Sequence, residues 1–142
     1  MNEYVFAEIP VGLTASFSRM ITLEMEDSFR AISGDENPLH RDDSFARETG
    51  EGKFDTHVAF GMLTASLYST MAGMYLPGKY SLIHSFDEIT FQKPVFAGDI
   101  LTVTGEVVER MEGLNLIILK VAIRNQNNKI VSKAKMKVLV TR

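Results

Sequence analysis

The sequence contains no cysteine. Disulfide bonds, thiolate nucleophiles and cysteine-based metal sites are therefore excluded. Positive charge is not in excess either, because 15 Lys and Arg residues stand against 18 Asp and Glu residues, so a nucleic-acid partner is not expected. Residues 1–20 lack a basic start followed by a continuous apolar run. We therefore expect no signal peptide and a cytoplasmic location.

Apolar residues make up 45% of the 142 residues, which is enough to build a core without a metal or a disulfide. This length suits a single domain that covers residues 1–142. Helical patterns dominate up to Gly78 and strand patterns dominate after it. Helices and strands that are grouped in this way indicate an α+β fold.

One stretch of the sequence carries no charge, from Val58 to Leu76. Apolar residues fall on every side of its helical wheel, which predicts a long helix that is buried all round. Interspersed Gly, Ser and Thr residues argue against a membrane span, and we expect no membrane partner. Pro77 and Gly78 are expected to end this helix.

The remaining pattern predicts a strand over 15–21, a helix from Thr22 to Ser33-Gly34, and a short helix over 43–48. Further strands are predicted near 80–85, 86–94, 99–111, 114–125 and 129–141. The simplest arrangement is one curved antiparallel sheet around the long helix. Such a sheet leaves an open edge, and pairing of edges across a two-fold axis predicts a homodimer or a higher homo-oligomer.

A polar loop joins the first two predicted helices and holds Asp35, Asn37, Pro38 and His40. Asp35 and His40 offer two proton-transfer groups on a loop that Pro38 stiffens, which suits the activation of a water molecule. From the spacing alone, an ordinary polar turn capped by Asp35 is the more common explanation.

Three motifs together resemble the MaoC-like (R)-specific enoyl-CoA hydratases. They are the Asp-x-Asn-Pro-x-His run over 35–40, Gly61-Met62-Leu63, and the segment over 91–99 that reads FQKPVFAGD. The resemblance covers the chain from about Phe17 to its end. It implies a hot-dog fold and a hydro-lyase that acts on acyl thioesters of coenzyme A or of acyl carrier protein. It implies no metal and no cofactor, because coenzyme A is part of the substrate.

The resemblance also implies roles for individual residues. Asp35 and His40 hold and activate the water, and Asn37 shapes the same polar network. Gly61 offers its backbone N–H to the thioester oxygen, and Ser69 lines the acyl side of the site. Without the resemblance, close helix packing explains Gly61 equally well, and a hydroxyl bonded to its own helix explains Ser69 better.

The chain departs from the family pattern at Phe60, where the family usually has histidine before the Gly-Met-Leu motif. His57, three residues earlier, is a candidate to fill that space. Five basic residues of predicted strands are candidate contacts for the phosphates of coenzyme A, or else a solvated face: Lys93, Arg124, Lys133, Lys135 and Lys137.

Two other functions remain open at this point. A non-catalytic acyl-CoA-binding or sensing domain would need neither Asp35 nor His40. A thioesterase shares the fold but needs a carboxylate at or near the long helix, and residues 58–76 contain none.

Overall fold

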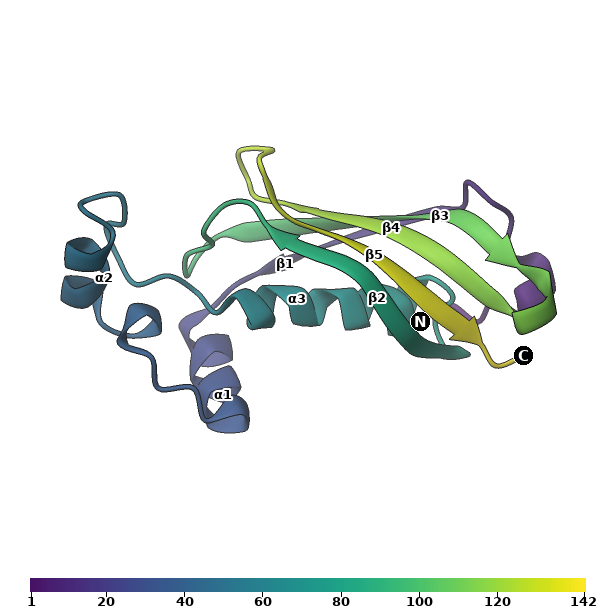
Figure 1. Ribbon diagram of the computed structural model, residues 1–142, viewed down its shortest axis with the longest axis horizontal. Helices are drawn as coiled ribbons and strands as arrows, with labels where there is room; N and C mark the ends of the chain where they lie inside the picture. Colours follow the sequence, from purple (N-terminus) through teal and green to yellow (C-terminus); the bar gives the residue numbers. More distant parts are fainter.

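The computed structural model describes residues 1–142. A curved five-stranded sheet wraps one side of helix α3; helix α1 lies close to the start of α3, and α2 lies farther out, beyond that end of the sheet (Figure 1). The elements are, in chain order, η1 (Phe6–Glu8), β1 (Thr14–Met20), α1 (Leu23–Ser33), η2 (Pro38–His40), α2 (Asp43–Thr49), α3 (Gly61–Thr70), η3 (Met71–Tyr75), β2 (Ser81–Phe91), β3 (Ile100–Met111), η4 (Glu112–Leu114), β4 (Leu116–Arg124) and β5 (Ile130–Val140). The predicted α+β architecture, a helix wrapped by a curved antiparallel sheet, is confirmed.

The strands follow the order β1-β3-β4-β5-β2, and every neighbouring pair is antiparallel. Side chains alternate along β4, where Leu119, Val121 and Ile123 are buried and Lys120 and Arg124 are exposed. The buried set belongs to one hydrophobic core with residues of α3 such as Tyr68. This alternation is the period-2 pattern that predicted the strands. The strand order leaves β1 and β2 as the two edges of the sheet.

The two strands predicted over 80–85 and 86–94 are a single strand, β2. Its pairing with β5 shifts register between Ile83 and Ser85, and again between Phe86 and Glu88. A bulge inserts an unpaired residue and reverses the alternation of the side chains. This reversal is why the sequence pattern breaks inside a continuous strand.

Helix α3 begins at Gly61, three residues later than predicted. The preceding segment is extended, because the N–H groups of Val58 and Ala59 donate to the carbonyls of Leu39 and Val95 at 3.0 and 2.8 Å. After Thr70 the chain makes a π-helical turn, η3.

The prediction that this helix is buried all round is wrong. Met62 is 60% exposed, and Ser66 and Ser69 are exposed as well. These three positions are spaced four and three residues apart, so they share one stripe of the helix. None of the helices combines the length and the hydropathy that crossing a bilayer requires.

The ends of α1 are set by local chemistry. The Thr22 hydroxyl accepts from the N–H of Met25 at 3.2 Å, and Gly34 takes the left-handed conformation at φ 71° that closes many helices. The carboxylate of Asp42 caps α2 in the same manner by accepting from the N–H groups of Ser44 and Phe45. These caps fix both ends of the polar loop that carries the candidate catalytic residues.

Candidate active site

A cleft of about 330 Å³ opens at the N-terminus of α3. Two of the predicted site residues, His40 and Gly61, line it together. The remaining lining comes from the loop before α3, from α3 itself and from the ends of β2 and β5: Phe54, Val58, Ala59, Thr64, Phe91, Gln92, Lys93, Pro94, Val95 and Val131. The cleft is mostly apolar, with few polar groups, as is usual for a small-molecule site.

The imidazole of His40 is fixed by a backbone carbonyl. Its Nδ1 lies 2.7 Å from the carbonyl oxygen of Val58. Because a carbonyl can only accept, Nδ1 must carry the proton, and in the neutral ring Nε2 then has a free lone pair. The ring also packs on Phe60, with centroids 4.4 Å apart. The neutral ring of His40 therefore keeps a lone pair on Nε2, which has no hydrogen-bond partner in the chain and can accept a proton.

The first turn of α3 has free hydrogen-bond donors. Phe60 stands at the N-cap and provides no side-chain acceptor. The first three N–H groups of a helix have no acceptor inside it, and those of Gly61, Met62 and Leu63 find none elsewhere in the chain. The ring of Phe91 lies over Gly61, where a Cβ would come within 3.4 Å of it. A helix N-terminus of this kind stabilises negative charge.

Asp35 and Asn37 form a stiff turn outside the lining of the cleft. The Asp35 carboxylate accepts from the N–H of Asn37 at 3.0 Å, and the Asn37 side chain accepts from the N–H of Leu39 at 3.0 Å. Both side chains are exposed in the single chain. Ser69, two turns along α3 from Gly61, also lies outside the cleft lining and belongs to the exposed stripe of that helix.

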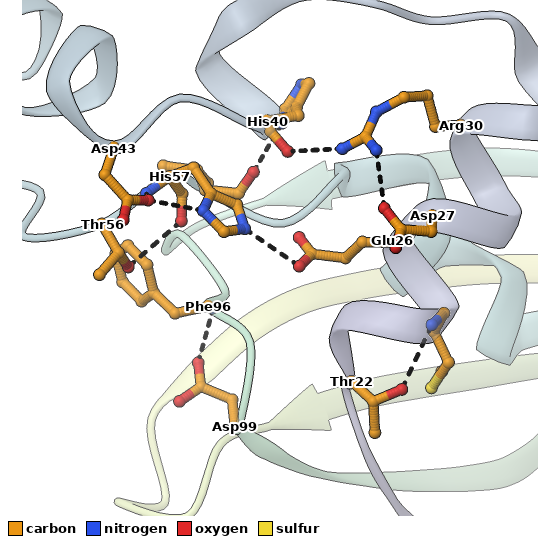
Figure 2. Close-up of polar contacts among 12 residues, drawn as sticks. Thr22, Glu26, Asp27, Arg30, His40, Asp43, Thr56, His57, Phe96 and Asp99 are labelled. Carbon is orange, nitrogen blue, oxygen red and sulfur yellow. Dashed lines mark hydrogen bonds and ion pairs between the residues drawn. The ribbon is translucent and has the colours of Figure 1, made fainter.

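His57 does not fill the space of the histidine that Phe60 replaces. Its ring lies between two carboxylates, with Nε2 3.1 Å from Glu26 and Nδ1 2.7 Å from Asp43 (Figure 2). Phe60 is only 2% exposed and contacts His40, Phe29 and the guanidinium of Arg30. Phe60 thus provides apolar support for the His40 ring.

The pKa values of His57 and Asp43 are shifted in opposite directions. Burial lowers the pKa of His57, but its hydrogen bonds to Asp43 and Glu26 and their negative charges outweigh this effect and raise it above 6.5. The backbone N–H and the ring of His57 lower the pKa of Asp43 below 3.8. These shifts favour a positively charged His57 between two carboxylates.

The cluster of Glu26, Asp43 and His57 is not predictable from local sequence patterns. Glu26, Asp43 and His57 are separated by 14 to 31 positions along the chain, so no local spacing relates them. Glu26 shares the first turn of α1 with Glu24, where the helix dipole alone explains an acidic residue. Glu26 is 1% exposed in the structure.

The five basic residues that are candidate contacts for the phosphates of coenzyme A do not lie together. Lys93 lines the cleft. Arg124, Lys133 and Lys135 line a larger hollow of about 710 Å³, which lies on the face of the sheet turned away from α3. Lys137 forms an ion pair with Asp87 at 3.2 Å. Only Lys93 is therefore near His40 and Gly61.

Comparison with known proteins gives concordant matches. The sequence model of the MaoC-like domain family matches residues 8–129. The chain is 37% identical over 118 residues to the (R)-specific enoyl-CoA hydratase of Aeromonas caviae, which covers 83% of this chain and 85% of that protein. It is 36% identical over 104 residues to the 3-hydroxybutyryl-CoA dehydratase of Methylorubrum extorquens, covering 73% of this chain and 64% of that protein.

Among solved structures, the R-hydratase of Pseudomonas aeruginosa in its unliganded form superposes with a TM-score of 0.86 at 31% identity. The superposition covers 96% of this chain and 84% of that chain. The sequence match spans most of the sheet, α3 and the loop that carries His40. The chain therefore belongs to the MaoC-like domain family and has the hot-dog fold.

Proposed function

We propose that the protein is an (R)-specific hydro-lyase that adds water to trans-2-enoyl thioesters and reverses that reaction. The hydratase and dehydratase relatives support the reaction class. The observation that carries the proposal is the shared cleft of His40 and Gly61. It brings a base with a free Nε2 next to helix N–H groups that have no acceptor.

In the proposed reaction, one water molecule is held between Asp35 and His40. Its hydroxyl forms the bond to the β-carbon, its proton is taken up by the pair, and the α-carbon receives a proton on the same face. Negative charge that develops on the thioester oxygen is stabilised by the N–H of Gly61. Removing one such donor lowers kcat by about 10²- to 10³-fold in other enzymes.

We propose that the site is completed by a second copy of the chain. Asp35, Asn37 and Ser69 are exposed in the single chain, and large apolar side chains are exposed on the edge strand β2, where Leu82 and Phe91 are 58% and 51% exposed. Pairing of β2 with its copy would bury such side chains and close the sheet edge. The proposed homodimer then places the acyl and pantetheine arms between subunits, with Asn37 and Ser69 as substrate contacts.

Sedimentation velocity at micromolar concentration tests this arrangement. A species of twice the chain mass is expected. A monomer with full activity would contradict a site that is shared between subunits.

The proposed substrate is a thioester of coenzyme A or of acyl carrier protein, and the chemistry requires no further cofactor. Hydration of crotonyl-CoA tests the reaction, because water addition removes the conjugated-thioester absorbance. We expect this absorbance to fall with the protein and to be stable with the His40→Gln variant. Binding of crotonyl-CoA without any loss of absorbance would instead favour a sensing domain, and release of free thiol would favour a thioesterase.

A further inference from the structure

Helix α1 presents two charged side chains to the segments around the cleft. Glu26 and Arg30 are four residues apart, so they lie on the same face of the helix. The carboxylate of Glu26 bonds His57 at 3.1 Å, and the guanidinium of Arg30 donates to the backbone carbonyl of His40 at 3.3 Å (Figure 2). One helix face therefore contacts both the loop that contains His40 and the segment that contains His57.

His57 joins that helix face to α2 as well. Its Nδ1 lies 2.7 Å from the Asp43 carboxylate, and its backbone N–H donates to the same oxygen at 2.9 Å. An ionised carboxylate only accepts, so both contacts of the ring are satisfied only when both ring nitrogens carry protons. The other charged groups nearby are Arg30, on the next turn of α1, and Arg47 of α2, which acts on Asp43.

The group that orients His40 belongs to the residue next to His57. Val58 directly follows His57, and its carbonyl accepts the proton on Nδ1 of His40 at 2.7 Å. The N–H of Val58 donates to Leu39 at 3.0 Å, next to His40 in the chain. Displacing His57 would therefore move the acceptor that sets both the tautomer and the direction of the His40 ring.

Burial of the Glu26–His57 ion pair has a cost in free energy. Glu26 is 1% exposed, and its second oxygen has no hydrogen-bond partner. Replacing such a pair with apolar residues is often neutral or stabilising. The one hydrogen bond of the Glu26 carboxylate is to His57, and His57 precedes Val58, whose carbonyl orients His40. This arrangement fits a role of Glu26 in positioning His40.

We propose that Glu26 and His57 are positioning residues for His40: they act through the Val58 carbonyl to keep Nε2 of His40 directed into the cleft, and their hold weakens when His57 loses its proton. The inference rests on the proposed hydration reaction. A neutral His57 would place a lone pair against one of the two carboxylates. Both hydrogen bonds of the His57 ring, to Glu26 and to Asp43, are therefore present at pH values below the pKa of His57, and one of them is lost above it.

Replacing Glu26 by glutamine or leucine separates these effects. In E26Q the amide oxygen accepts from a protonated His57, and the amide N–H donates to a neutral His57. The hydrogen bond between residue 26 and His57 is therefore kept both below and above the pKa of His57. In E26L the hydrogen bond between residue 26 and His57 is absent at every pH. E24Q is the matched control, because Glu24 is an exposed glutamate on the same helix and loses the same charge.

The experiment is the pH profile of kcat for crotonyl-CoA hydration in the wild type and the three variants. E26L is expected to lower kcat about 10- to 100-fold, a loss of the size found for residues that orient metal-binding histidines, with little change in KM. E26Q should recover most of that loss and lack the alkaline decline of the wild type, and E24Q should follow the wild type. Wild-type kcat in E26L, or an unchanged alkaline decline in E26Q, would overturn the proposal.

Nitrogen-15 NMR of the His40 ring gives a readout that needs no turnover. We expect the tautomer protonated at Nδ1 in the wild type and in E26Q, and a mixture of tautomers in E26L or, where E26L does not fold, in the wild type above the pKa of His57. If the wild-type protein did not hydrate crotonyl-CoA, the proposed function would be refuted. The NMR spectra would still show whether Glu26 and His57 position the His40 ring. A His40 tautomer that changes neither with the substitution of Glu26 nor with pH would refute that positioning role.

Discussion

The proposed role of Gly61 predicts that one substitution at this position lowers activity without lowering stability. The perturbation is Gly61→Pro, with Gly61→Ala as its control. Gly61 is the first residue of α3, and Phe60 before it has φ −59° and ψ 126°. Proline is favoured at the first helical position, and the residue before a proline prefers this extended conformation. The backbone therefore accepts proline without strain, and only the N–H is lost.

The magnitudes follow from these contacts. A Cβ at position 61 would meet only the ring of Phe91, at 3.4 Å or more, which is an ordinary van der Waals contact that needs no shift of the ring. Both substitutions reduce the freedom of the unfolded chain, so each should leave the free energy of unfolding unchanged or raise it by about 0.4–1 kcal/mol. Loss of the donor should cost about 2.7–4 kcal/mol of transition-state stabilisation in the proline variant.

The assay combines crotonyl-CoA hydration with thermal unfolding. Gly61→Pro should melt at or above the wild-type temperature while kcat falls about 10²- to 10³-fold. Gly61→Ala retains the N–H and should lose far less activity. A folded proline variant that is as active as the alanine variant would refute the role of this N–H.

Three further predictions follow from the same contacts. Asp35→Asn and His40→Gln should each lower kcat by orders of magnitude without loss of folding, because both groups serve proton transfer on a capped loop; circular dichroism and crotonyl-CoA kinetics check this. Phe60→His should lower the free energy of unfolding by about 1–3 kcal/mol, because a polar ring would enter a site that is 2% exposed; urea unfolding measures it. The raised pKa of His57 adds stability that is complete below pH 6.5 and is lost as the pH rises through the pKa of the folded state, so the difference in urea midpoint between wild type and His57→Gln should shrink with rising pH.

Local chemistry was well predicted from the sequence. Thr22 and Gly34 mark the ends of α1 because a cap and a left-handed glycine act within a few residues. The strands were found from their period-2 alternation, except in β2, where bulges interrupt that period. The start of α3 was misplaced because the bonds that keep Val58 and Ala59 extended come from Leu39 and Val95, which no local pattern reveals.

The candidate site was predictable only in part, for the same reason. His40 and Gly61 were proposed from motifs, and the structure brings them into one cleft. The carbonyl that fixes His40 and the carboxylates around His57 depend on tertiary contacts across 14 to 31 positions. The roles of Asp35, Asn37 and Ser69 stay predictions, because these side chains face outward in the single chain.

The stereochemistry of hydration is a direct test of the proposed single-water mechanism. Asp35 and His40 flank Pro38 on one short loop, so both should act on the same face of the double bond, while the thioester oxygen is held at Gly61. Crotonyl-CoA is incubated in heavy water, the product is resolved by chiral chromatography, and deuterium at the α-carbon is located by NMR. We expect (R)-3-hydroxybutyryl-CoA formed by syn addition. An (S) product, anti addition or the absence of hydration would contradict it.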